Sequence, residues 1–287
     1  MVEHKLQKYS IFDLVNYGVM SMVILLTLYP FLYLLVVSIS PVEELMKSSL
    51  IIFPQKLTLE PYAYVFKHSG IGNAYKNTII ITVGGVLLNL LLTSFGAYVI
   101  ANREVPGRKF FTTLIIATMM FSGGMIPLYL VVKSLNFINS LWALIVPNAI
   151  AAFWLIVLRN FFQSVPASLS ESARMDGCSE YGILFRIILP LSMPILSTLA
   201  LFHAVGQWNV YFNAVIYISD TKLQPLQVLV RSMYQSTSDA YTPDDLPPPV
   251  ETIRAATVIV ATLPILCVYP FLQKYFVQGM MIGAVKG

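Results

Sequence analysis

The sequence ESARMDG occupies residues 171–177, and nine residues later it is followed by IILP at residues 187–190. Most of the first segment consists of residues that favour a helix. Ser164 is placed to cap the beginning of such a helix, and Gly177 can end it in a left-handed turn. These signals predict a short, charged surface helix over residues 166–178.

The chain around this segment is poor in charge. Of its 287 residues, 57% are hydrophobic and 11% are charged, whereas soluble domains have about 45–50% apolar and about 25% charged residues. So few charged side chains cannot cover the surface of a soluble protein, which makes the bilayer the expected solvent. The net charge of +4 is scattered, which argues against nucleic acid as a partner.

Six apolar segments are long enough to cross a hydrocarbon core of about 30 Å, which takes about 20 helical residues. They are residues 14–38, 77–101, 110–132, 141–158, 189–218 and 253–275. We therefore expect one all-α transmembrane domain over residues 1–287, with a long loop at residues 159–188 and a C-terminal tail at residues 276–287.

The basic residues orient these segments. If the N-terminus is cytoplasmic, ten Lys and Arg residues fall in the cytoplasmic segments and seven in the outer loops. Arg254 lies at a membrane boundary and is not counted. Four of the seven outer residues lie in one long loop, where the charge rule is weak. Both termini and the 159–188 loop are therefore predicted to be cytoplasmic.

The spacing of ESARMDG and IILP resembles a signature of permease subunits of bacterial ABC importers. That signature reads EAA, three residues, G, nine residues and I-x-L-P, and only Ser172 departs from it, where the family usually has Ala. The Trp208-Asn209 pair and residues 274–287 are similar to the carbohydrate-uptake branch, as in the second permease of the maltose importer. Within that branch, the chain most resembles the subgroup that imports complex oligosaccharides, including alginate.

The resemblance implies a methionine-importer-like (type I) permease fold with six transmembrane helices in the bacterial inner membrane. It also implies a heterodimer with a second, homologous permease, two ATP-binding subunits, and an extracytoplasmic binding protein that delivers an oligosaccharide. ATP binding would close the ATP-binding subunits and switch the permeases from inward-facing to outward-facing, and hydrolysis would reset the cycle.

Two groups of residues would contact the ATP-binding subunits if the family pattern holds. The first is the coupling helix in the 159–188 loop, represented by Glu171, Ser172, Ala173, Asp176 and Gly177. The second is a flexible docking tail that includes Gly283, Lys286 and Gly287.

Catalysis is not expected on this chain. A P-loop needs glycines and a Gly-Lys pair to hold phosphates, and the sequence contains no Gly-Lys dipeptide. Its three histidines are isolated, and none begins an H-E-x-x-H zinc motif. We therefore expect no catalytic residue, metal or cofactor here, with ATP and Mg on the partner ATPase subunits.

Polar side chains are concentrated in the fifth apolar segment. They are His203, Gln207, Trp208, Asn209, Asn213 and Tyr217. If this segment is one continuous helix, its spacing places His203, Gln207, Asn213 and Tyr217 near one face. Either they line a sugar pathway, or they form hydrogen bonds between helices. The maltose-importer resemblance favours the second interpretation. Asn89 and Asn148 are open to the same two interpretations, and Ser122-Gly123-Gly124 indicates a kink or hinge.

Three other functions are weighed against a sugar permease. An ABC permease for a non-sugar solute would share the same signature. A secondary transporter needs charged residues at membrane depth, but the six segments contain no acidic residue in their interiors. An intramembrane enzyme needs a catalytic group near His203, and the sequence offers none.

Overall fold

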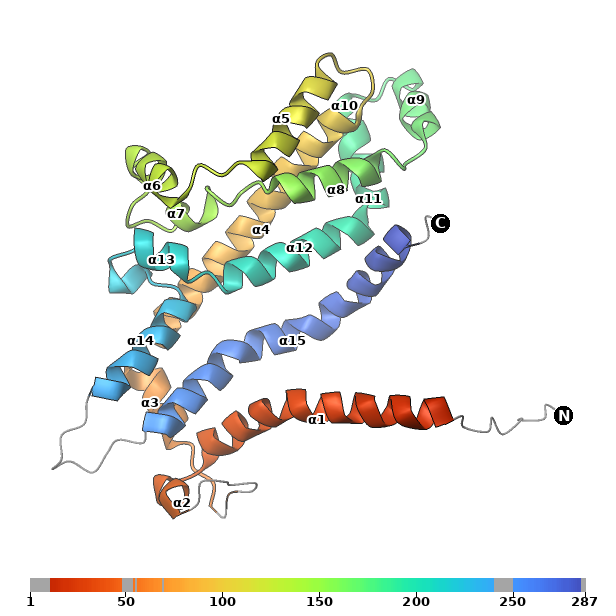
Figure 1. Cartoon of the computed structure of the whole chain (residues 1–287). Helices are drawn as coiled ribbons and strands as arrows, with labels where there is room; N and C mark the ends of the chain where they lie inside the picture. The colour runs from red at the N-terminus through yellow and green to blue at the C-terminus, as the bar shows by residue number, and fades with distance from the viewer. Residues whose placement is uncertain (1–10, 48–53, 55, 69, 240–249, 285–287) are drawn as a thin grey trace. The chain divides into compact units, whose positions relative to one another are not determined.

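The structure, a computed structural model, describes residues 11–47, 54, 56–68, 70–239 and 250–284. Within these residues the chain is helical and contains no strand (Figure 1). It divides into two compact units. The first comprises the described parts of Met1–Ser69 and Met233–Thr262, and the second comprises Gly70–Ser232 and the described part of Leu263–Gly287. The predicted all-α fold class is confirmed.

The first unit contains α1 and the two short helices that follow it. Its elements are α1 (Ile11–Ile39), α2 (Val42–Lys47), α3 (Glu60–His68), the end of α14 (Leu226–Asp239) and the first part of α15 (Val250–Ala284). The side chains of Ser38 and Tyr62 share a hydrogen bond of 2.7 Å that joins α1 to α3. Most apolar side chains of α1 are exposed, as expected of a helix that faces lipid.

The second unit is arranged around α4 and carries the segments of functional interest. Its elements are α4 (Ile71–Ala101), α5 (Arg108–Met120), α6 (Met125–Ser134), α7 (Trp142–Ile145), α8 (Ala152–Phe162), α9 (Ala167–Met175), α10 (Glu180–Ile183), the π-helical turn η1 (Leu184–Ile188), α11 (Leu189–Leu191), α12 (Met193–Trp208), α13 (Phe212–Tyr217), the 3-10 turn η2 (Thr221–Leu223), the start of α14 and the end of α15. α4 packs against α8 and α12.

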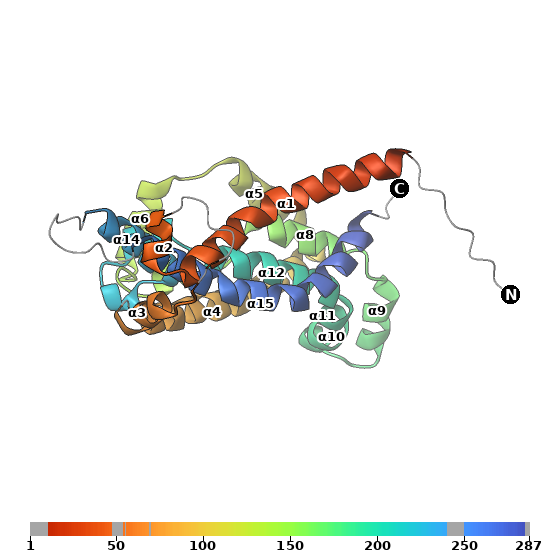
Figure 2. The ribbon, with the colours of Figure 1, turned by 90° about the horizontal axis from the view of Figure 1, so that it is seen from below.

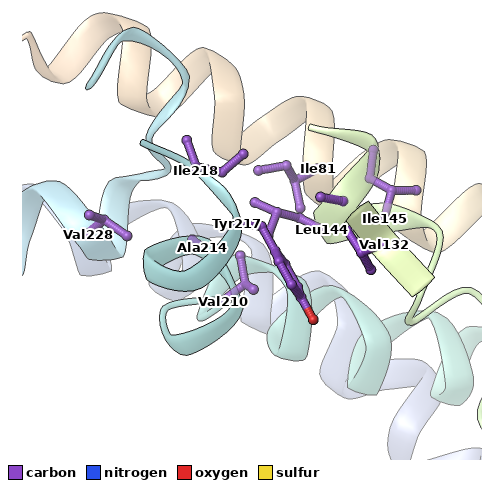
Figure 3. Close-up of a cluster of buried hydrophobic side chains, with 10 residues drawn as sticks. Ile81, Val132, Leu144, Ile145, Val210, Ala214, Tyr217, Ile218 and Val228 are labelled. Carbon is purple, nitrogen blue, oxygen red and sulfur yellow. The ribbon is translucent and has the colours of Figure 1, made fainter. Parts of the chain in front are cut away.

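Two apolar clusters hold the second unit together. One joins α4 to α6, α7, α13 and α14 around the fully buried Leu144 and Tyr217 (Figure 3). The other joins the C-terminal part of α4 to α8, α10, η1 and α12 through residues such as Leu158, Ile183 and Leu199. Close packing on both sides fixes the position of α4 within the unit.

Three helices are long and apolar enough to cross a membrane: α1, α4 and Glu251–Val268 within α15. Two further crossings result if each bent pair of helices counts as one span. The first pair is α5 and α6, bent by 117°, and the second is Glu180–Leu191 and α12, bent by 81°. Among the described residues this gives at most five crossings by length and composition, and a sixth at residues 141–158 stays a prediction.

Three predicted helices are interrupted in the structure. Residues 110–132 break between α5 and α6, where Gly124 has a backbone angle φ of 85° and ψ of 176°, and this confirms the predicted irregularity at Gly123-Gly124. Residues 141–158 form the four-residue α7 and the eleven-residue α8 rather than one helix. Residues 189–218 are divided because α12 ends at Trp208 and α13 begins at Phe212.

Candidate functional site

The segment ESARMDG forms the C-terminal part of α9 and the turn after it. Gly177 has a φ of 80°, in the left-handed region. The amide of Cys178 donates to the carbonyl of Ala173 at 2.9 Å, and that of Gly177 donates to the carbonyl of Arg174 at 3.0 Å. This pair of bonds is the Schellman motif that ends helices, so the predicted role of Gly177 in the turn is confirmed.

The beginning of α9 differs from the sequence prediction. Ser164 was expected to cap the helix, but its hydroxyl donates to the carbonyl of Phe161 at 2.6 Å instead. Pro166 occupies the N-cap position and makes no side-chain cap. The helix therefore begins one residue later than predicted, at Ala167, and depends on the fixed backbone angle of proline for its start.

The five residues predicted to dock on an ATPase subunit lie on the surface of α9 and its turn. Glu171, Ser172, Asp176 and Gly177 are exposed, and Ala173 is half-buried against the second apolar cluster. Met175 is not one of those five predicted residues, but it lies in the same helix, and 89% of its surface is exposed.

Arg174 links α9 to two other elements. Its Nε donates to Glu180 Oε1 at 2.7 Å and its Nη2 donates to Glu180 Oε2 at 3.4 Å. The Tyr98 hydroxyl of α4 donates to Glu180 Oε2 at 2.5 Å, and Glu104 Oε2 lies 3.7 Å from Arg174 Nη1. The carboxylate of Glu180 therefore accepts hydrogen bonds from both α9 and α4. Sequence reasoning predicted a charged face here but not these pairs.

A polar cavity of about 600 Å³ lies between α9 and the end of α4. Its lining includes Tyr98 and Arg103 on one side and Glu171 and Arg174 on the other. Figures 1 and 2 show α9, α10 and α11 grouped near that end of α4. The predicted coupling residues therefore lie beside the end of the helix on which the second unit is arranged.

A second cavity, of about 350 Å³, lies between α8 and α12. It collects polar side chains that are far apart in the sequence: Asn148, His203, Gln207 and Asn213. The stacked rings of Trp154 and Phe202, whose centroids are 5.0 Å apart, also line it. Amide groups beside aromatic rings are suited to hydrogen-bond hydroxyl groups and to stack on apolar ring faces.

Gln207 and His203 lie where α12 comes close to Gly85 of α4. Gln207 is only 3% exposed, and a Cβ atom added at Gly85 of α4 would lie 2.7 Å from its Nε2. The imidazole of His203 contacts the backbone of Gly85, while its buried Nε2 has no hydrogen-bond partner among the described residues. The glycine therefore allows α4 to approach α12 closely at the edge of the cavity.

The remaining predicted pathway residues lie elsewhere. The ring of Trp208 lies 6.2 Å from that of Tyr75. Asn209 ends α12 and accepts a hydrogen bond from Gln227 at 3.1 Å. Tyr217 belongs to the apolar cluster of Figure 3. The prediction that His203, Gln207, Asn213 and Tyr217 share one helix face is wrong, because the helix is interrupted after Trp208.

Asn89 illustrates the alternative role of polar groups at this depth. Its side chain is 1% exposed, and its Nδ2 donates to the carbonyl of Ala149 at 3.0 Å. It therefore joins α4 to the segment before α8, as the interpretation of hydrogen bonds between helices predicts.

The C-terminal segment is helical over most of the predicted tail. α15 extends to Ala284, so residues 276–284 continue the helix, and the docking role of the tail stays a prediction. Gly283 lies in the last turn of this helix, and Lys286 and Gly287 lie outside the described residues.

The chain is similar to known proteins over nearly its whole length. It is 42% identical to the polygalacturonan/rhamnogalacturonan transport system permease protein YtcP of Bacillus subtilis (strain 168), over 98% of this chain and 100% of that protein. It is 45% identical to the protein LplC of the same organism, over 99% of this chain and 98% of that protein.

A solved structure and a family model agree with these relatives. A chain of a bacterial ABC transporter involved in the import of the acidic polysaccharide alginate matches with a TM-score of 0.86 and 32% identity, over 93% of this chain and 99% of that chain. The model described as "binding-protein-dependent transport system inner membrane component" matches residues 90–282. The chain therefore belongs to the family of binding-protein-dependent transport system inner membrane components.

Proposed function

We propose that this chain is a permease subunit of an ATP-driven carbohydrate importer and forms half of the pathway for an oligosaccharide delivered by an extracytoplasmic binding protein. The observation that carries this proposal is α9. It is a short surface helix with a fixed C-terminal turn, and it displays Glu171, Ser172 and Met175 to a partner. A helix of this kind can enter a groove on a separate protein as a rigid unit.

The partners follow from this role. The chain pairs with a second, homologous permease, and each permease rests on one ATP-binding subunit through its α9. ATP and Mg are bound by those subunits, so this chain binds no cofactor and catalyses no reaction. It spans the inner membrane several times, with both termini and α9 in the cytoplasm. The end of α15 and the residues beyond it, including Gly283, Lys286 and Gly287, extend toward the ATPase dimer.

The mechanism is a transfer of movement. When ATP binding closes the ATPase subunits, α9 moves with the groove that holds it, and the membrane helices change from inward-facing to outward-facing. Glu171 and Asp176 contact the ATPase surface, and Gly177 keeps the turn that points the helix toward it. Hydrolysis then separates the ATPase subunits and returns the permease to its first state.

The carbohydrate class is supported by two observations. YtcP and the alginate transporter are named for the transport of saccharides. The cavity between α8 and α12 adds amide groups at Asn148, Gln207 and Asn213 beside the Trp154 and Phe202 rings. Such a lining can bind the hydroxyl groups of a sugar and stack on its ring.

Reconstitution tests this proposal. The chain is placed in liposomes with its companion permease, with or without the ATPase subunit, and supplied with the binding protein and a tritium-labelled galacturonate trisaccharide. We expect uptake only with the ATPase and with ATP. Uptake without the ATPase would identify a secondary transporter. ATP-driven uptake of amino acids or peptides, with no uptake of any oligosaccharide offered, would identify a non-sugar permease.

A further inference from the structure

We propose that Arg174, Glu180 and Tyr98 form a clamp that fixes α9 to α4, so that α4 carries the movement of α9 to the membrane cavity. This inference rests on the proposed function, because it concerns how movement of α9 is used. It assigns Arg174 and Glu180 as positioning residues, distinct from the residues that meet the ATPase.

The carboxylate of Glu180 is the centre of the clamp. Arg174 donates two hydrogen bonds to it from α9, at 2.7 and 3.4 Å. Tyr98 donates a third from α4 at 2.5 Å. An Arg fork that binds both oxygens of a carboxylate fixes its orientation as well as its distance, so α9 and α4 are joined through a defined geometry.

The turn between α9 and α10 is also fixed. The Schellman motif at Gly177 closes the end of α9, and Ser179 caps α10 by accepting from the amide of Gly182 at 3.3 Å. A Cβ atom at Gly182 would lie 2.6 Å from Cys178 Sγ, so this turn is closely packed. Arg174 and Glu180 are therefore held on either side of one compact turn.

From the clamp, α4 leads to the cavity without interruption. It is a single helix from Ile71 to Ala101, and Tyr98 and Gly85 are about 20 Å apart along its axis. Gly85 meets Gln207 and His203 at the edge of the cavity. Movement at Tyr98 is thus delivered by a rigid helix to the contact between α4 and α12.

The covalent route from α9 to α12 is less direct. It passes through the π-helical turn η1 and a bend of 81° before α12 begins. Bends and π-turns are places where helices yield. The clamp provides a second connection that bypasses this bend.

The ion pair between Arg174 and Glu180 is too exposed to be explained by a contribution to folding stability alone. The side chains of Arg174 and Glu180 are 31% and 51% exposed, and exposed pairs contribute little to folding stability. Their loss should therefore leave assembly intact and change how much transport each ATP produces.

The first test uses the complete importer with Arg174→Gln, Glu180→Gln or Tyr98→Phe in this chain. The variants are compared by co-purification of the ATPase, ATP hydrolysis, and uptake of the labelled galacturonate trisaccharide. We expect the ATPase to co-purify normally with all three variants. Transport per ATP should fall by about fivefold in Arg174→Gln and Glu180→Gln, which is the lower end of the usual range for the coupling between two sites. Tyr98→Phe should have a smaller effect, and the exchange Arg174→Glu with Glu180→Arg should recover part of the loss.

The matched control is Arg186→Gln. Arg186 is an exposed arginine of the same loop, and the structure gives it no ion pair among the described residues. We expect its transport per ATP to be unchanged. Unchanged transport per ATP in both Arg174→Gln and Glu180→Gln would overturn the clamp. Absence of ATP-driven uptake in the unmodified importer would instead refute the proposed function.

A second test covers variants that fail to assemble. Tyr98 and Glu180 are both replaced by cysteine in a chain whose two native cysteines, Cys178 and Cys267, are replaced by alanine. The double replacement removes the clamp, and a short bis-methanethiosulfonate reagent then rebuilds the link through two disulfide bonds, which a thiol reductant can cleave. We expect cross-linking to raise transport per ATP. A further fall on cross-linking, reversed by reduction of the link, would mean that α4 and α10 must separate, and would overturn the proposal.

Discussion

At the scale of single residues, the side chains that join α4 to its neighbours are positioned by contacts between residues far apart in the sequence. Tyr98 and Glu180 are 82 positions apart, and Asn89 and Ala149 are 60 apart. Local patterns carry information on helix ends and turns, which is why Gly177 could be assigned from the sequence. They contain nothing on which residue of α4 meets Glu180, so Tyr98 and Glu104 could not be found.

Met175 provides the first test at this scale. If it is buried when α9 docks, Met175→Ser should weaken binding of the ATPase subunit by about tenfold or more, since burial of a Met side chain contributes about 1.5–3 kcal/mol. The free chain should keep its thermal stability, because the side chain is 89% exposed there. Binding is measured by titration of the ATPase in detergent.

Met120→Ser is the matched control for this measurement. Met120 is also highly exposed, at 77%, but it ends α5 and lies away from α9 in the sequence. We expect it to leave ATPase binding unchanged. Equal affinities for Met175→Ser and the unmodified chain would show that Met175 stays outside the interface.

Gly85 provides a second residue-scale test. An alanine there places Cβ 2.7 Å from Gln207 Nε2, so the buried amide must shift, at a cost of about 1 kcal/mol. Gly72→Ala in the same helix meets nothing within 4 Å and should be neutral or slightly stabilising. Both are measured as thermal unfolding in detergent. Equal stability of the two variants would contradict the close approach of α4 to α12.

At the scale of elements, the apolar segments were found but their continuity was not. Residues 77–101 lie within one helix, α4, whereas residues 110–132, 141–158 and 189–218 are each divided. Hydropathy records the length of an apolar run and not the backbone angles within it. Gly123-Gly124 gives a local signal for the first break, whereas near the interruption after Trp208 the sequence has only Gly206, which lies inside α12 and does not end it.

The break between α5 and α6 makes a testable prediction. Gly124 combines a φ of 85° with a ψ of 176°, a conformation that is essentially limited to glycine. Gly124→Ala should therefore lower the unfolding free energy by about 1–3 kcal/mol. Gly123→Ala, whose Cβ would lie 3.9 Å from Pro127, should cost much less. Comparable losses for the two variants would argue against the conformation at Gly124.

At the scale of the whole molecule, composition and one short motif predicted the class of protein. The apolar composition indicated a membrane protein, and the spacing of ESARMDG and IILP indicated the family that the relatives and the family model confirm. The cavity between α8 and α12 could be predicted only in part. Asn148, His203, Gln207 and Asn213 were candidates as polar groups in apolar segments, but Trp154 and Phe202 carry no signal that separates them from lipid-facing aromatics.

The central claim is that an ATPase drives this permease through α9. The measurement that tests it most directly is ATP-dependent uptake of the labelled galacturonate trisaccharide by reconstituted importer carrying Glu171→Ala. Glu60→Ala, which removes an exposed carboxylate from α3, is the control. We predict that Glu171→Ala loses both ATPase co-purification and most of the uptake, while Glu60→Ala keeps both. Full ATP-driven uptake by Glu171→Ala would contradict the account.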